Sequence, residues 1–156
     1  MTKVLFVCTG NVCRSPLSEG YLKHLLSKNG LNGVDVSSAG IAALVGAPPF
    51  ECAIEVAQKH GFDISEHIAR QITSPLIEEI DRIFCMESWQ MSIVKEMDPK
   101  RVGRVALLGS FHPEKSPQFQ IPDPSDFTTP ETLITFDLIK PSIEAFFASL
   151  TSEITK

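Results

Sequence analysis

Hydrophobic and polar positions divide the chain into alternating strand-like and helix-like segments. Strand-like segments cover residues 4–7, 34–38, 82–86 and 105–108, and the first is an apolar run with the length and the β-branched content of a buried strand. Helical segments follow them at residues 16–28 and 50–60, through Trp89, Ile93 and Met97, and at residues 131–150. This alternation predicts parallel strands joined by crossover helices, so the pattern indicates a single α/β domain built on an open parallel sheet.

Glycine and proline mark the expected ends of these segments. Gly30 stands where the C-cap of the first helix would lie, and Gly61 ends the second helical segment. Ser15 is expected to cap the first helix, with Pro16 at its first helical position. Pro141 falls inside the last helical stretch, where we expect a kink or two shorter helices.

Composition and charge are those of one ordinary globular domain. The chain has 156 residues, 43% of them hydrophobic and 21% charged, so we expect one domain over residues 1–156. The net charge of -5 and the lack of a basic stripe argue against a nucleic-acid-binding protein. No apolar stretch approaches the roughly 18 residues of a membrane span, and the first strand starts too early for a signal peptide. These features predict a cytoplasmic protein that binds neither nucleic acid nor membrane.

The four cysteines, Cys8, Cys13, Cys52 and Cys85, have neither zinc-site spacing nor the density of a disulfide scaffold. Reduced thiols fit a cytoplasmic protein, and no metal is expected. Cys52 lies in a helical segment and Cys85 in a strand, and we interpret both as structural. Cys8 differs from them because it directly follows the first apolar run and opens a loop.

This loop, residues 8–15, has the features of a phosphate-binding site with its own nucleophile. It lies between a strand end and a helix N-terminus, where backbone N–H groups turn inward beside the positive end of the helix dipole. Cys8 would share that field, which favours the thiolate. Arg14 can place its planar guanidinium over the same hollow and bind a dianion with paired hydrogen bonds. We expect the bound phosphate to be surrounded by Thr9, Gly10, Asn11, Val12, Cys13, Arg14 and Ser15.

Phosphate transfer to a cysteine also needs an acid that protonates the leaving oxygen. Asp123 is the leading candidate, because Pro122 and Pro124 restrict the backbone on both sides of it. Its loop follows the fourth strand, and ligands of open α/β sheets bind beyond the carboxyl ends of the strands. Asp123 is therefore expected on the same side of the sheet as Cys8.

The chain resembles the low-molecular-weight protein tyrosine phosphatases nearly from end to end. The matching segments are residues 4–16, Ser38-Ala39-Gly40, residues 61–71, 81–87 and 107–111, and Pro122-Asp123-Pro124. The resemblance implies a four-stranded parallel sheet with helices on both faces, and a phosphoprotein substrate. It also implies no metal and no cofactor, and we expect a monomer or a weak dimer.

The resemblance also implies roles for the residues of the site. Cys8 attacks the phosphorus while Asp123 protonates the tyrosyl oxygen, and a water activated by Asp123 then hydrolyses the phosphocysteine. Cys13 is implied to protect an oxidised Cys8 by forming a disulfide with it. Asn11 is implied to adopt a left-handed backbone, which asparagine tolerates better than most residues. Its implied tethers are Ser15, Ser38 and His67.

The walls of the substrate cleft depart from the eukaryotic members, which have two tyrosines after the acid Asp-Pro. This chain has Ser125 and Asp126 there, followed by Phe127, and Leu44 stands where the opposite wall often has an aromatic residue. A stacked ring would contribute about 0.5–1.5 kcal/mol beyond its buried area. We expect weaker binding of small substrates or a different protein preference, with Leu44 and Phe127 as the walls.

Three alternative functions remain open. Phosphoarginine phosphatases of the same fold have threonine where this chain has Val12, which favours the tyrosine hypothesis. Arsenate reductases need two further cysteines after the third strand, and only Cys85 lies in that region. A non-catalytic phosphoresidue-binding module would be expected to lose the nucleophile or the acid. Redox sensing through Cys8 and Cys13 remains a possible secondary role.

Overall fold

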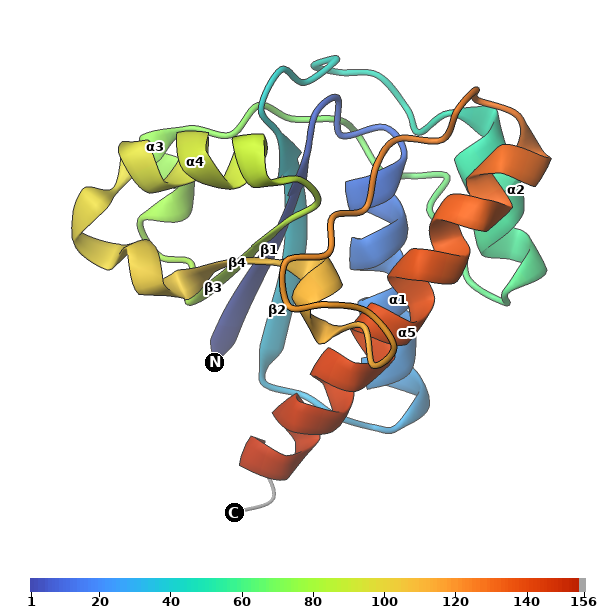
Figure 1. The fold of residues 1–156 in the computed structure, drawn as a ribbon. Helices are drawn as coiled ribbons and strands as arrows, with labels where there is room; N and C mark the ends of the chain where they lie inside the picture. Colours follow the sequence, from blue (N-terminus) through green and yellow to red (C-terminus); the bar gives the residue numbers. More distant parts are fainter. Residues whose placement is uncertain (155–156) are drawn as a thin grey trace.

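A computed structural model describes residues 1–154 and contains one four-stranded parallel sheet (Figure 1). Its strands are β1 (Thr2–Cys8), β2 (Val34–Gly40), β3 (Arg82–Cys85) and β4 (Val105–Leu107), in the order β2-β1-β3-β4. All neighbouring strands pair in parallel, and β1 pairs with both β2 and β3. The predicted strands and their parallel arrangement are confirmed. Since β1 is central, its carboxyl end lies in the middle of one edge of the sheet.

Helices cover both faces of the sheet, as expected. One face carries α1 (Arg14–Lys28), α2 (Glu51–Lys59) and α5 (Thr129–Ile154), and the other carries α3 (Ser74–Ile77) and α4 (Ser88–Met97) (Figure 1). Side chains of β1 alternate between two cores: Phe6 packs on the α1 side and Leu5 on the α4 side. Both faces are buried, which explains why the strand reads as a continuous apolar run.

Short elements were missed because they have no measurable periodicity. The four residues of α3 are stabilised by Thr73, whose side chain accepts a hydrogen bond from the N–H of Leu76. Two 3₁₀ helices flank β4: η1 (Pro99–Arg104) precedes it and η2 (Leu108–Phe111) follows it. Along residues 1–154, no helix has both the length and the hydrophobicity needed to cross a membrane.

The start of α1 differs from the expectation. The helix begins at Arg14, its N-cap is Cys13, and no side chain caps it, so Pro16 is the third helical residue rather than the first. Ser15 is not the capping residue, because its buried hydroxyl faces Cys8 and Asn11 instead. The expected glycine ends are confirmed: Gly30, with φ 64°, directly follows the C-cap of α1, and Gly61, with φ 85°, that of α2.

The last helix runs through Pro141 as one element, so of the two expected outcomes, a kink or two shorter helices, the second is wrong. Its apolar stripe continues across the proline, because Phe136 and Ile139 before it and Ile143 and Phe146 after it are all fully buried. Burial of one face in a single core holds both halves together, although the proline ring removes one backbone hydrogen bond.

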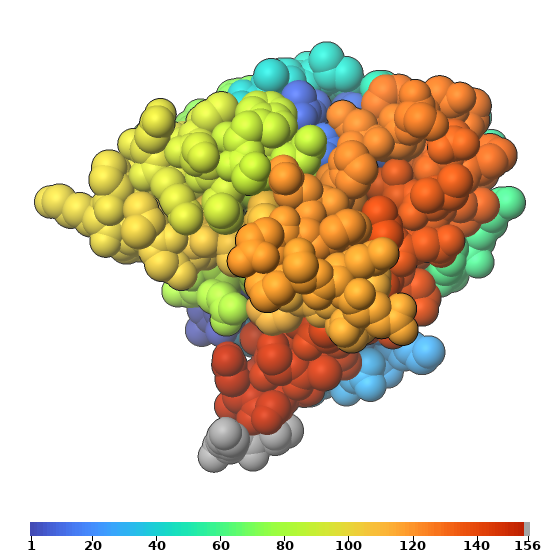
Figure 2. Space-filling model, in the orientation of Figure 1, coloured from blue at the N-terminus to red at the C-terminus, as the bar shows by residue number. Residues whose placement is uncertain are grey.

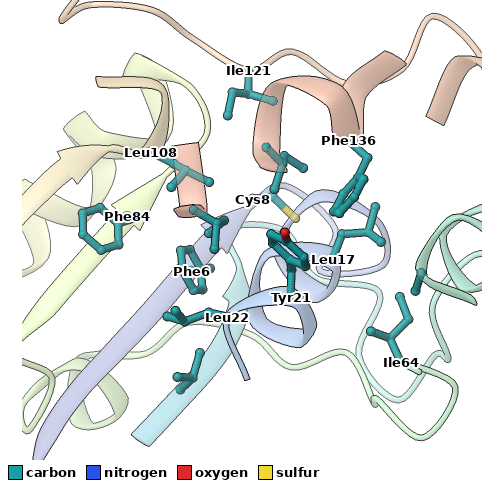
Figure 3. Close-up of a cluster of buried hydrophobic side chains, with 14 of the residues drawn as sticks. Phe6, Cys8, Leu17, Tyr21, Leu22, Ile64, Phe84, Leu108, Ile121 and Phe136 are labelled. Atoms are coloured by element: carbon teal, nitrogen blue, oxygen red, sulfur yellow. The ribbon is translucent and has the colours of Figure 1, made fainter. Parts of the chain in front are cut away.

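This core supports the end of β1, where the candidate nucleophile lies (Figure 3). Phe6 and Cys8 stand on the same strand and face α1 and α5. Tyr21 of α1 packs edge-on against Phe136 of α5, with ring centroids 5.4 Å apart. The end of β1 is therefore packed against the side chains of the core that α1 and α5 form with the sheet.

Candidate active site

Cys8 is the last residue of β1, and its side chain is almost completely buried. Its Sγ lies 2.9 Å from Oγ of Ser15, in the first turn of α1. The chain between them bends from strand into helix over five residues, 9–13. A hydroxyl at this distance can donate to a thiolate, which stabilises the charged form of the cysteine.

Asn11 holds this bend in shape. It is fully buried and has φ 59°, and no other non-glycine residue among residues 1–154 has a positive φ. Its Nδ2 donates to Oγ of Ser15 at 2.7 Å and to Oγ of Ser38 at 2.9 Å. Nε2 of His67 lies 3.0 Å from its carbonyl oxygen. The structure thus brings together Asn11 and all three residues expected to tether it.

Two further residues extend this network and were not foreseen. The backbone N–H of Arg70 donates to Oδ1 of Asn11 at 2.9 Å. Glu19 accepts a hydrogen bond from Oγ of Ser38 at 2.7 Å and lies 4.0 Å from Nδ1 of His67. Glu19 follows Ser15 by one helical turn, a spacing that could have indicated it, whereas a backbone donor leaves no signal in the sequence.

Arg14 is buried, with 1% of its side chain exposed, and two carboxylates lie beside it. Its Nη1 donates to Oε2 of Glu87 at 2.7 Å and to the carbonyl oxygen of Ile121 at 2.8 Å. Its Nε is 3.0 Å from Oδ1 of Asp123, close enough for an ion pair. That contact does not have hydrogen-bond alignment, so Nε lacks a hydrogen-bond acceptor in residues 1–154. This buried donor therefore has a charged neighbour but no aligned acceptor among these residues.

Glu87 and Gln90 connect Arg14 and the loop to α4, and both were missed. They form a reciprocal capping box at the start of that helix. Nε2 of the fully buried Gln90 also donates to Oγ1 of Thr9 at 3.1 Å. Glu87 lies two residues beyond the end of β3 and Thr9 one residue beyond the end of β1, and these strands are neighbours. The rule that ligands bind beyond strand ends could therefore have indicated Glu87.

The segment that carries Asp123 lies along the start of α4. The N–H of Ile121 donates to the carbonyl oxygen of Met86 at 2.9 Å. Oε1 of Gln120 accepts from the backbone N–H of Ser88 at 2.8 Å and from its hydroxyl at 3.1 Å. These contacts bring Asp123 to Arg14, with half of its side chain exposed.

A cavity of about 230 Å³ opens beside Cys8. It is lined by Cys8, Thr9, Gly10, Val12, Cys13, Ala42, Leu44, Phe50, Asp123 and Phe127. Figure 2 shows blue atoms of the N-terminal part between the cyan and orange surfaces of later segments. Leu44 and Phe127, the two expected walls, are each about half exposed. Phe50 is a further wall residue that was not expected, and its ring meets Phe127 edge-on at 4.7 Å.

The cysteines are all free thiols, and all are buried. Burial raises the pKa of Cys13, with smaller contributions from Cys52 and Cys8, so this thiol stays protonated at neutral pH. Burial also raises the pKa of Cys85, to about 12. Cys85 is fully enclosed in β3, where it is not available for a disulfide relay. In residues 1–154, no group of three or more His, Cys, Asp or Glu side chains could hold a metal ion.

Comparison with known proteins identifies the family. The family model for low molecular weight phosphotyrosine protein phosphatase matches residues 3–156. The probable low molecular weight protein-tyrosine-phosphatase EpsP of Ralstonia nicotianae is 41% identical over 121 residues, which are 78% of this chain and 77% of EpsP. A structure of Vibrio vulnificus Wzb in complex with benzylphosphonate is 34% identical and has a TM-score of 0.82, covering 95% of this chain and 98% of Wzb.

One structural neighbour has a different activity. A structure of the arginine phosphatase YwlE has a TM-score of 0.87, covers 96% of each chain and is 24% identical, a level at which the likeness shows the fold alone. The family model and the curated relatives agree on the tyrosine phosphatases. The chain belongs to the low molecular weight phosphotyrosine protein phosphatase family.

Proposed function

We propose that this protein hydrolyses phosphotyrosine in proteins through a phosphocysteine intermediate on Cys8. The observation that carries the proposal is that Cys8 and Asp123, far apart in the chain, line one cavity beside the buried Arg14. The Vibrio relative binds benzylphosphonate, a phosphonate joined to an aromatic ring. Apolar walls above a polar floor suit a ligand of that chemistry.

In the first step, the Cys8 thiolate attacks phosphorus while the bond to the tyrosyl oxygen breaks. Backbone N–H groups of the loop and Nε of Arg14, which has no aligned acceptor of its own, bind the phosphoryl oxygens, whose charge they stabilise. Asp123 gives its proton to the departing oxygen, so tyrosine leaves as the neutral phenol. The products of this step are tyrosine and a phosphocysteine.

In the second step, water breaks the sulfur–phosphorus bond. Asp123, now a carboxylate, takes a proton from the water as its oxygen joins phosphorus. The sulfur leaves as a thiolate, which the Ser15 hydroxyl 2.9 Å away stabilises. Inorganic phosphate is released and Cys8 is restored.

The test uses the reduced, purified protein and p-nitrophenyl phosphate, without added metal. We expect hydrolysis by the wild type, no turnover by Cys8→Ser, and activity close to wild type for the matched variant Cys52→Ser. Full activity in Cys8→Ser would overturn the mechanism. A trapped phosphocysteine, detected by mass spectrometry after rapid acid quenching, would support it directly.

The substrate class rests on Val12, which is 5% exposed and lines the cavity beside Cys8. Its methyl groups offer no hydrogen bond to a guanidinium. We expect the wild type to hydrolyse phosphotyrosine faster than phosphoarginine, and Val12→Thr to narrow the difference. A wild type that prefers phosphoarginine would overturn the substrate assignment.

Location, assembly and redox protection complete the proposal. Four free thiols support a reducing, cytoplasmic location, and the acidic net charge of -5 supports a protein that does not bind nucleic acid. We propose a monomer or weak dimer, which sedimentation would test.

Cys13, which lines the cavity with Cys8, is proposed to trap an oxidised Cys8 as a disulfide.

A further inference from the structure

One wall of the cavity combines two parts of the chain. The ring of Phe50, at the start of α2, meets the ring of Phe127 edge-on. One turn later, Glu55 of α2 accepts a hydrogen bond from the Thr129 hydroxyl, at the start of α5. Figure 1 shows the segment before α5, in orange, beside the first turn of α2. We call this surface, formed by residues 50–55 and 125–131, the α2–α5 wall.

The α2–α5 wall carries four carboxylates, Glu51, Glu55, Asp126 and Glu131. The first three are exposed and the fourth is partly exposed. Three of them accept hydrogen bonds from neutral donors: Glu55 from Thr129, Asp126 from Thr128 and Glu131 from Ser125. No ion pair among residues 1–154 includes any of the four.

Lys59, four residues after Glu55 in α2, is the lysine or arginine nearest the wall along the chain, and no ion pair among residues 1–154 includes it. Within three chain positions of any residue that lines the cavity, Arg14 is the only lysine or arginine, and it is already paired with Glu87 and Asp123. Arg70 approaches through its backbone, but its Nε donates to the carbonyl oxygen of Ser38. The N-termini of α2 and α5 contribute roughly half a positive charge each, which is much less than four carboxylates. The wall therefore keeps a net negative charge.

We propose that the α2–α5 wall selects substrates in which lysine or arginine flanks the phosphotyrosine, and disfavours those with acidic flanking residues. The inference rests on the proposed function, because the phosphotyrosine must occupy the cavity for its neighbours to reach the wall. A lysine or arginine stem can lie on the exposed ring of Phe127 while its charge faces Glu51 or Asp126. An acidic neighbour would be repelled by the carboxylates of the wall.

The test compares two phosphotyrosine peptides of equal length, one with lysine on each side of the phosphotyrosine and one with glutamate. We expect kcat/KM to be roughly tenfold higher for the lysine peptide at low ionic strength. The ratio should fall toward one in about 0.5 M salt, because exposed charges are screened there. Equal rates at low salt, or a preference for the glutamate peptide, would overturn the inference.

Variants separate the wall from the overall charge of the protein. The double variant Glu51→Gln/Asp126→Asn should lower the ratio at least about threefold, and Asp126→Asn keeps a side-chain oxygen that can accept from Thr128. The matched control is Glu153→Gln, which lies roughly 35 Å along α5 from the wall at 1.5 Å per residue and should leave the ratio unchanged. If the ratio of kcat/KM for the two peptides is unchanged in the double variant, or falls equally in the control, the α2–α5 wall is not the cause of the preference.

p-Nitrophenyl phosphate distinguishes the two proposals. If the wild type hydrolyses it and both peptides at equal rates, the wall inference fails and the proposed function stands. If the wild type hydrolyses none of the three, the proposed function fails, and the inference with it.

Discussion

Asp123 is both paired with a buried cation and accessible from the cavity. It forms an ion pair with the buried Arg14, yet half of its side chain is exposed to the cavity mouth. We expect Asp123→Asn to lower kcat for p-nitrophenyl phosphate roughly 10²–10⁴-fold, because an amide cannot protonate the leaving oxygen. Inhibition by inorganic phosphate should stay within about threefold of wild type, since Arg14 and the loop remain. An unchanged kcat with much weaker inhibition would instead make Asp123 a binding residue.

Glu87 positions Arg14 without reaching the cavity lining. We expect Glu87→Gln to lower kcat/KM for p-nitrophenyl phosphate by about tenfold, because the guanidinium loses the charged partner that orients it. Glutamine retains an oxygen that can cap α4, so the helix should persist. Steady-state kinetics measure the effect, with Glu79→Gln, at an exposed ion pair, as the matched control. Equal kinetics for the two variants would exclude this role.

Among the elements, α5 departs most from the rules of local sequence, because Pro141 lies inside it. Proline removes one helical hydrogen bond and crowds the preceding turn, but it also restricts the unfolded chain. We expect Pro141→Ala to raise the free energy of unfolding by about 1–2 kcal/mol, measured by urea denaturation with activity unchanged. A loss of stability would show that the proline ring contributes more to packing than it costs the helix.

At the scale of the whole molecule, two buried thiols link stability to pH. Burial raises the pKa of both Cys13 and Cys85, whereas in the unfolded chain they ionise near pH 8.5. The folded state therefore keeps protons that the unfolded state releases. Their contribution to stability is complete below about pH 8.5 and declines as pH rises toward the raised values.

We expect the urea midpoint, measured in reductant, to fall from pH 8.5 to pH 11. Each thiol contributes up to about 1.4 kcal/mol per pH unit in that range. Cys85→Ala should remove the contribution of one thiol and so make the decline of the urea midpoint with pH shallower. This change in slope is expected even if the variant is less stable than wild type at pH 7. A decline of the same steepness in this variant would show that other groups cause it.

Much of the fold and of the site was accessible from the sequence. Apolar runs and their spacing predicted the parallel sheet, and the loop from Cys8 to Ser15 marked the site. What escaped were interactions between distant segments. Gln90 reads as a helix residue and Gln120 as a loop residue, and only the folded chain shows that they tie α4 to Thr9 and to the Asp123 segment. Ser15 was predicted from local rules to cap α1. In the folded chain its hydroxyl instead contacts Cys8 and Asn11.

The sequence by itself determined the succession of strands and helices along the chain and the loop that carries the candidate nucleophile, because these depend on local periodicity and on neighbours in the chain. Only the tertiary structure decided which side chains meet across the sheet edge. It placed Glu87 and Asp123 beside Arg14, and it packed Phe50 against Phe127 in one wall of the cavity. The physical reason is that burial and charge act through space, whereas the pattern of a sequence records only what each segment requires along its own length.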